Sequence, residues 1–187
     1  EQVTGTVLIL DADFVFRSPI HSVAPSGVVI AQEWFGPGTL GSLRYRLESV
    51  ASVDPARVEP FTWPMLIDAG DLARLMPRWL ELTAELRRTV GMWESDMVAL
   101  VGAVAESDLE VRYETLGAWM DWPQAFAAGA PIIHYCQEVL DRDGERIWYK
   151  QGYRPWEPIG RDPNDAALDY CRDFLHLLDE FIRSRTT

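Results

Sequence analysis

TVLILDAD, residues 6–13, is the stretch from which the fold of this chain is predicted. The segment from Thr6 to Leu10 carries no charge and three of its five residues are β-branched, a composition typical of a strand buried on both faces of a sheet. Asp11 and Asp13 follow directly. Because open α/β sheets bind ligands at the carboxyl ends of their strands, both carboxylates are candidates for a binding site.

Two carboxylates one residue apart converge only if the chain turns, and at close range they repel unless a cation lies between them. A hard divalent cation is the natural solution, so Asp11 and Asp13 are predicted metal ligands. The alternative is a solvated turn, in which Asp is common. The position directly after an uncharged strand favours the metal site. Two classes of enzyme place such a pair there, the haloacid-dehalogenase-type phosphatases and the nucleotide-sugar glycosyltransferases of the GT-A fold.

Composition narrows the classes of partner. The length of 187 residues predicts a single domain over residues 1–187, and 48% apolar residues suffice for a core. Lys and Arg number 17 against 29 Asp and Glu, and the net charge of −12 argues against nucleic acid and anionic lipid as partners. No apolar run approaches the ~20 residues that cross a bilayer, so no membrane segment is expected within this chain.

Strands and helices alternate along the chain, which predicts the α/β class. Further strands are expected at 27–31 and 131–136, and helices are expected to begin at Pro77, to be capped by Ser95 and to run over 162–185. A strand buried on both faces needs neighbours on each side. Few strands follow, so part of the sheet is expected to precede the first residue.

Two acidic motifs follow in the middle of the chain. Asp68 lies two residues before Gly70, where the carboxylate could accept hydrogen bonds from sugar hydroxyls and the glycine would allow close approach of a ligand; an ordinary turn is the alternative. Glu94 and Asp96 stand at a predicted helix start, where the helix dipole alone would stabilise them. Their functional interpretation is a pair that faces positive charge forming on a transferred sugar.

His134 and a later basic loop complete the candidates. A lone His in an apolar strand is usually a core residue, but here it could supply the third ligand of the proposed metal and shift the preference from Mg²⁺ towards Mn²⁺. Lys150 and Arg154 lie in a Gly- and Pro-bearing loop of a strongly acidic chain. Such a loop could fold over a phosphate group, or it could be an ordinary surface loop.

Taken in order, these segments resemble a GT-A glycosyltransferase. Asp11-Ala12-Asp13 is similar to the DxD motif of that fold, Asp68-Ala69-Gly70 to its Asn-Ser-Gly, and Glu94-Ser95-Asp96 to the Asp-Gln-Asp of retaining galactosyltransferases. His134-Tyr135-Cys136, with Lys150 and Arg154-Pro155-Trp156, is similar to a His-Tyr-Cys-Gly and Lys-Pro-Trp run. The run LDADFVFRSP at 10–19 also resembles the hydroxyproline arabinosyltransferases and peptidyl serine galactosyltransferases.

The resemblance implies a metal-dependent transfer, with retention, of a sugar from a nucleoside-diphosphate donor to a protein or glycan hydroxyl. It implies that Asp11, Asp13 and His134 hold Mn²⁺, or Mg²⁺, against the diphosphate. The resemblance also implies that Asp96 lies under the anomeric carbon. Glu94, Asp68 and Gly70 would lie at the sugar, and Lys150 and Arg154 would lie at the phosphates. It further implies that this chain is the carboxyl-terminal portion of a GT-A domain, which has a Rossmann-like mixed sheet. The nucleoside-binding half of that domain would be missing from the chain. The alternatives are the phosphatase, whose late acidic motif Asp68 and Asp71 could imitate, and a non-catalytic module that binds sugar and metal.

Overall fold

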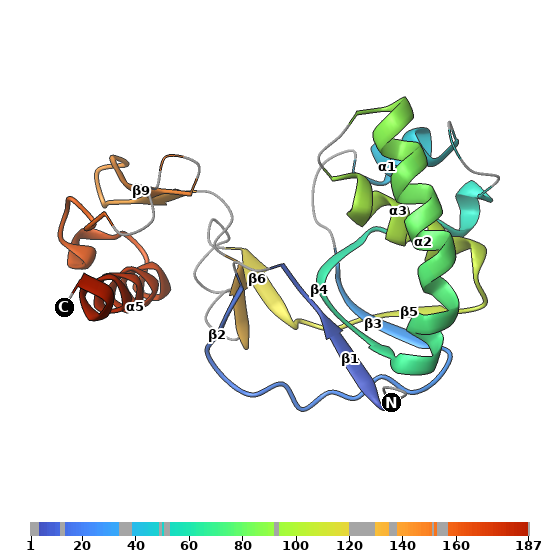
Figure 1. Cartoon of the computed structure of the whole chain (residues 1–187), viewed down its shortest axis with the longest axis horizontal. Helices are drawn as coiled ribbons and strands as arrows, with labels where there is room; N and C mark the ends of the chain where they lie inside the picture. Colours follow the sequence, from blue (N-terminus) through green and yellow to red (C-terminus); the bar gives the residue numbers. More distant parts are fainter. Residues whose placement is uncertain are drawn as a thin grey trace. The chain divides into compact units, whose positions relative to one another are not determined.

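The computed structural model describes residues 4–11, 14–33, 39–48, 50, 53–91, 94–119, 130–134, 138–150, 152 and 157–186. Where the length predicts one domain, the chain divides into two compact units, and each is described by itself. Unit 1 comprises residues 1–10 and 21–116, and unit 2 comprises residues 11–20 and 117–187. Both contain helices and strands, so the chain is a mixed α and β structure, which is compatible with the predicted α/β class (Figure 1).

Unit 1 is built on a four-stranded mixed sheet in the order β1-β4-β3-β5. β4 is antiparallel to both of its neighbours, whereas β3 and β5 are parallel, so β1, β3 and β5 all run in one direction. The strands are β1 (Thr6–Ile9), β3 (Val28–Glu33), β4 (Phe61–Asp68) and β5 (Glu110–Tyr113). The carboxyl ends of β1, β3 and β5 therefore lie at one edge of the sheet, which is also the edge at which β4 begins.

Burial is concentrated in the two central strands. β3, predicted at 27–31, and β4 are buried along almost their whole length, because each has a strand on both sides. The prediction that the strand at residues 6–10 is buried on both faces is wrong. β1 is half-buried throughout and stands at the end of the strand order, paired with β4. A run of uncharged β-branched residues suits such a half-covered strand equally well.

The described part of this unit has three α-helices: α1 (Thr39–Glu48), α2 (Ala69–Thr89) and α3 (Ser95–Glu106). A short 3₁₀ helix, η1, spans Pro55–Arg57. α3 contacts both α1 and α2, and it is buried on all sides from Met97 to Ala105, as expected of a helix that is apolar all round. Gly102 makes this packing possible, since a Cβ there would lie 2.7 Å from Leu47 Cδ2 and 3.3 Å from Leu82 Cδ1.

Two predicted helix starts need correction. Pro77 does not begin a helix but lies inside α2, which starts eight residues earlier, where the Asp68 carboxylate accepts hydrogen bonds from the backbone of Gly70 and Asp71. The cap and the apolar face that α2 buries outweigh the interior proline. Ser95 is the first residue of α3 rather than its cap, and its side chain is buried.

Among its described residues, unit 2 has five short strands, grouped as a three-stranded sheet β2-β7-β6 and the hairpin β8-β9. The strands are β2 (Phe14–Phe16), β6 (Gly117–Trp119), β7 (Ile132–His134), β8 (Glu138–Leu140) and β9 (Arg146–Tyr149). β7 lies within the strand predicted at 131–136. It pairs antiparallel with β2 and parallel with β6, so this sheet too is mixed.

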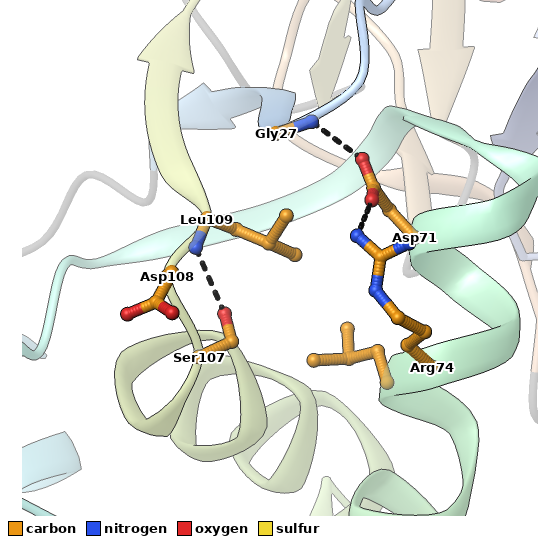
Figure 2. A pocket seen from close by; sticks show the side chains of 7 residues that line it. Gly27, Asp71, Arg74, Ser107, Asp108 and Leu109 are labelled. Carbon is orange, nitrogen blue, oxygen red and sulfur yellow. Dashed lines mark hydrogen bonds and ion pairs between the residues drawn. The ribbon is translucent and has the colours of Figure 1, made fainter.

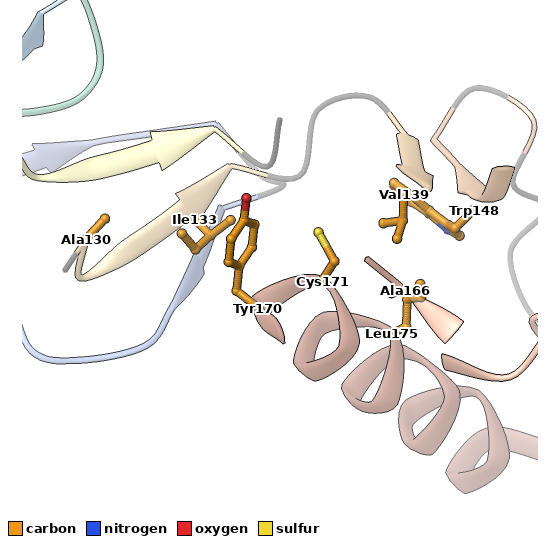
Figure 3. Packing of buried hydrophobic residues seen from close by; sticks show 8 residues of the cluster. All are labelled: Ala130, Ile133, Val139, Trp148, Ala166, Tyr170, Cys171 and Leu175. Carbon is orange, nitrogen blue, oxygen red and sulfur yellow. The ribbon is translucent and has the colours of Figure 1, made fainter. Parts of the chain in front are cut away.

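The core of unit 2 forms where β7 and the hairpin meet the last helix, α5 (Asp169–Thr186). Figure 3 shows the side chains of Tyr170, Cys171 and Leu175 projecting from α5 towards the strands. The spacing of the sequence predicts one apolar side for this segment, formed by Leu168, Cys171, Leu175, Leu178 and Ile182. The structure buries Cys171, Leu175 and Ile182.

The start of the last helix differs from the predicted span of 162–185. Asp162 does act as a cap, accepting a hydrogen bond from the Asn164 backbone at 2.9 Å, but it caps only the short 3₁₀ helix η2 (Pro163–Asp165). Ala166 then forms a β-bridge with Asp141, and the Ala167 backbone donates to Leu140 at 3.0 Å. These bonds to the end of β8 hold the chain extended, so α5 begins only at Asp169.

Within the described ranges, none of the helices has the length and apolar character that crossing a membrane requires.

Candidate functional site

The structure brings Asp11 and His134 together. β2 and β7 pair antiparallel with Phe14 opposite His134, so the segment that precedes β2 reaches the carboxyl end of β7. The Phe14 backbone N–H also donates to the Asp11 carbonyl oxygen at 3.4 Å, an i-to-i+3 bond of the kind found in turns. As a result, His134 Nε2 lies 3.6 Å from Asp11 Oδ2. The pairing of β2 with β7 thus places the Asp11 carboxylate beside the His134 imidazole.

The two partners differ in exposure. The His134 side chain is 8% exposed and the Asp11 side chain 47%, so a buried nitrogen base faces a carboxylate that solvent reaches. At 3.6 Å the two atoms are farther apart than an ordinary hydrogen bond. Two atoms that are each bonded to one cation at ~2.1 Å lie about 3–4 Å apart. The separation, and the combination of imidazole with carboxylate, therefore fit a shared transition-metal dication such as Mn²⁺.

Several predicted site residues lie outside the described residues, namely Asp13, Tyr135, Cys136, Arg154, Pro155 and Trp156. In the part of the chain that is described, no group of three or more His, Cys, Asp or Glu side chains is arranged to hold a metal ion. The described part of the predicted metal centre therefore consists of two of its three ligands, Asp11 and His134.

Lys150 belongs to the same unit and lies exposed in the turn that follows β9. The Gly152 backbone donates to the Tyr149 carbonyl oxygen at 3.1 Å and closes this turn. A Cβ at position 152 would lie 3.2 Å from Tyr149 Cδ1, so the tightness of the turn accounts for the glycine. An exposed ammonium in a tight turn could reach an anionic ligand, as the sequence predicts.

Asp68 and Gly70 have a local structural role. Asp68 Oδ1 accepts the Gly70 and Asp71 backbone N–H groups at 2.9 and 3.3 Å, and a Cβ at position 70 would lie 3.1 Å from the same oxygen. The close approach that this glycine allows is therefore that of the capping carboxylate. Asp68 also pairs with Thr6, at the opposite end of β1 from Ile9. The structure thus does not bring Asp68 to the end of β1 from which Asp11 follows.

Glu94 and Asp96 lie at the other edge of this sheet. Thr62, near the start of β4, donates to Met97 Sδ at 3.1 Å, and the Trp79 indole donates to the Asp96 carbonyl oxygen at 2.7 Å. The first turn of α3 is thereby held next to the edge at which β4 begins and β1 and β3 end. Glu94 forms an ion pair with Arg46 at 3.1 Å. Both acids thus lie at the start of a helix, as predicted, and at the sheet edge where α/β proteins bind ligands.

A cavity that the sequence did not indicate opens at the opposite edge of the unit 1 sheet. It has a volume of about 230 Å³ and is lined by Gly27, Asp71, Arg74, Leu75, Ser107, Asp108 and Leu109. Figure 2 shows Asp71 directed at the Gly27 backbone and at Arg74. No local signal could have revealed this arrangement, because Gly27 and Asp71 are distant in sequence.

The hydrogen bonds made by Asp68 and Asp71 weaken the phosphatase alternative. That hypothesis needs Asp68 and Asp71 as a late acidic motif near the metal. Asp68 caps α2, and the Asp71 carboxylate is fully buried against the Gly27 N–H and Arg74. Both carboxylates are engaged in hydrogen bonds that hold α2 and the start of β3 in place.

Comparisons with models of protein families, with curated proteins and with solved structures found no match for this chain.

Proposed function

We propose that this protein is a metal-dependent glycosyltransferase of the GT-A class, which moves a sugar from a nucleoside-diphosphate donor to a hydroxyl of a protein or glycan. The observation that carries the proposal is the approach of Asp11 to His134, whose nearest atoms lie 3.6 Å apart. The order of the motifs predicts that the DxD-like segment and an imidazole distant in sequence belong to one site. The short distance between Asp11 and His134 supports that prediction.

The residues of this chain have distinct roles in the proposed reaction. Asp11 and His134, with Asp13, would hold a divalent cation, which when bound supplies a Lewis acid for the diphosphate leaving group. Lys150 would place a positive charge on the same phosphate oxygens, and Arg154 would add a second. Asp96 and Glu94 would face the sugar, where their carboxylates stabilise positive charge that develops at the anomeric carbon. Asp68, which caps α2, and Gly70, whose N–H donates to that cap, are left out of the proposed site.

The first test measures binding of Mn²⁺ alone by titration calorimetry. Wild-type protein should bind Mn²⁺, and Asp11→Asn or His134→Gln should weaken binding by at least about tenfold, since each removes one ligand. Asp173→Asn and His176→Ala are matched controls, because both residues lie exposed on α5 of the same unit. Unchanged affinity in Asp11→Asn and His134→Gln would contradict the metal site.

The second test measures turnover. With Mn²⁺ present, the protein should hydrolyse or transfer from UDP-galactose or UDP-arabinose, and Asp13→Ala and Asp96→Asn should abolish this activity. Donor binding without turnover would instead indicate a non-catalytic module. Release of phosphate from p-nitrophenyl phosphate, with no cleavage of nucleotide sugars, would indicate the phosphatase.

A further inference from the structure

The imidazole of His134 is stacked on the phenyl ring of Phe14. The ring centroids are 4.2 Å apart and the planes are inclined by 15°. The two residues lie directly opposite each other in the β2–β7 pair, and both are buried. The stack is therefore part of the sheet of unit 2 rather than a chance contact of mobile side chains.

A stacked neighbour restricts the torsion that decides where the imidazole nitrogens point. The χ2 angle of His has a broad energy profile, so an unconstrained ring samples many orientations. A flat ring lying almost parallel at 4.2 Å blocks rotation about χ2, because a rotated imidazole would collide with the phenyl face. In the orientation so held, Nε2 faces Asp11 Oδ2 at 3.6 Å.

We infer that Phe14 is a positioning residue, which holds the His134 imidazole in the orientation that lets Nε2 and the Asp11 carboxylate share one divalent cation. This inference rests on the proposed function for the identity of the ligand. Hydrogen-bond partners that orient a metal-binding His are energetically important, and their loss typically weakens metal binding 10- to 100-fold. Here the contact is an aromatic stack supplied by the residue that follows the DxD-like segment.

The experiment compares three variants at positions on β2. Phe14→Leu keeps an apolar side chain but removes the flat ring, and Phe14→Tyr keeps the ring. Phe16→Leu makes the same chemical change on the same strand at a side chain that is 54% exposed. The probe is Mn²⁺ alone at pH 8, with free Mn²⁺ measured by electron paramagnetic resonance. Phe14→Leu should weaken binding about tenfold or more, whereas Phe14→Tyr and Phe16→Leu should bind as the wild type does.

A second readout needs no metal. In metal-free protein, ¹³C relaxation of the His134 ring should report a rigid imidazole in the wild type, Phe14→Tyr and Phe16→Leu, and a mobile one in Phe14→Leu. A merely structural role of Phe14 would lower the unfolding midpoint without changing ring motion or metal affinity in the folded protein. Phe14→Met serves in the same measurements if Phe14→Leu does not fold.

The outcomes separate this inference from the proposed function. Wild-type ring rigidity and Mn²⁺ affinity in folded Phe14→Leu would overturn the role of Phe14 and leave the metal site intact. A wild-type protein that binds no Mn²⁺ would overturn the proposed function, and with it the metal-binding part of this inference. Ring motion in Phe14→Leu then still decides whether Phe14 orients the imidazole.

Discussion

The Asp71 carboxylate is buried in unit 1 while its cationic partner is not. Its side chain is 0% exposed and accepts a hydrogen bond from the Gly27 backbone at 2.6 Å, whereas the Arg74 side chain, which also bonds to it, is 70% exposed. The backbone bond joins the first turn of α2 to the residue before β3. The ion pair with Arg74 is screened by solvent, so the two bonds should differ in their contribution to stability.

We therefore expect Asp71→Ala to lower the free energy of unfolding by about 1–3 kcal/mol, because it leaves the partly buried Gly27 N–H without its acceptor. Arg74→Ala should cost less than about 1 kcal/mol, since it removes a mostly exposed partner. Urea unfolding of the two variants measures both values. A larger loss for Arg74→Ala would show that the ion pair, and not the backbone bond, holds the two segments together.

The cap at Asp68 leads to a second prediction at this scale. Asp68→Ala should destabilise the protein by about 0.5–2 kcal/mol, because two N–H groups of the first turn of α2 lose their acceptor. Turnover of nucleotide sugars should persist in the folded variant. Asp68→Ser, which can still cap, should recover most of the stability, as followed by urea denaturation. Loss of turnover in folded Asp68→Ser would return this residue to the sugar site.

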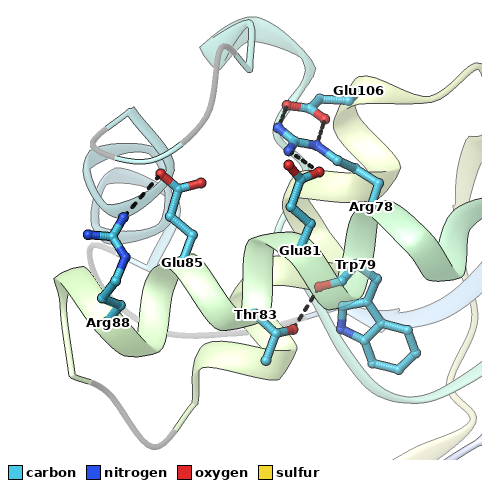
Figure 4. Close-up of polar contacts among 7 residues, drawn as sticks. All are labelled: Arg78, Trp79, Glu81, Thr83, Glu85, Arg88 and Glu106. Carbon is cyan, nitrogen blue, oxygen red and sulfur yellow. Dashed lines mark hydrogen bonds and ion pairs between the residues drawn. The ribbon is translucent and has the colours of Figure 1, made fainter.

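At the scale of elements, α2 and α3 are joined by an ion-pair group. Figure 4 shows the Arg78 guanidinium from α2 between Glu106 of α3 and Glu81 of its own helix. Arg78 Nε donates to Glu106 Oε2 at 2.5 Å and Nη2 to Glu106 Oε1 at 2.8 Å, a bidentate arrangement. The hydrogen bonds from Arg78 lower the pKa of Glu106 from its ordinary value of 4.5. The carboxylates hold the pKa of Arg78 above its usual range.

This lowered pKa predicts how stability depends on pH. Since the folded-state pKa of Glu106 lies below the unfolded value, the pair contributes its full stabilisation above about pH 4.5 and loses it as the pH falls through the folded-state pKa. Glu106→Gln should cost about 1–2 kcal/mol at pH 7, and the difference from wild type should vanish in acid.

Urea midpoints of wild type and Glu106→Gln between pH 3 and pH 7 measure this effect. Glu85→Gln is the control, because Glu85 Oε1 lies 3.9 Å from Arg88 in a largely exposed pair on the same helix. Its midpoint should follow that of wild type at every pH. A constant gap between wild type and Glu106→Gln down to pH 3 would contradict the assignment.

Helix packing in unit 1 depends on a glycine. Gly102→Val should lower the free energy of unfolding by about 1–3 kcal/mol, because the added side chain overlaps Leu47 of α1 and Leu82 of α2. Gly41→Val is the matched control, since a Cβ at Gly41 in α1 meets nothing within 4 Å. Thermal unfolding of the two variants compares them directly. Equal losses would mean that helix propensity, and not packing, sets the cost.

At the scale of the whole molecule, each of the two units has a hydrophobic interior of its own. In unit 2 the free thiol of Cys171 is part of the core, and burial raises its pKa to about 12. At pH 8 this thiol is therefore both covered and protonated, and a thiol reagent can reach it only when the core opens.

We predict that Cys171 in a Cys136→Ser background reacts with Ellman's reagent at pH 8 only as fast as unit 2 opens. Leu175→Ala, which removes a fully buried side chain of α5, should accelerate the reaction strongly, because it weakens the core by about 2–5 kcal/mol. Leu177→Ala is the control, since that side chain is 55% exposed on the same helix. Rapid labelling of the parent protein would show that the thiol is accessible in the folded state.

The candidate site was only partly predictable from sequence. The order of short motifs was enough to pair Asp11 with His134 across most of the chain, because each motif keeps a recognisable local composition. Asp68 could not be assigned in the same way. A carboxylate two residues before a glycine is equally typical of a helix cap and of a ligand contact, and only the structure shows that Asp68 accepts the N–H groups of Gly70 and Asp71 as a cap.

By itself, the sequence determined the α/β class, the strand beginning near Val28, the apolar face of the last helix and the segments that carry acidic chemistry. These properties depend on local composition and periodicity, which a single chain displays directly. Tertiary structure alone decided that β1 is half-buried, that α2 continues through Pro77, that the bridge from Ala166 to Asp141 delays α5 and that Asp71 is held against Gly27. Each of these outcomes depends on a partner far away in sequence, whose free-energy contribution no local pattern contains.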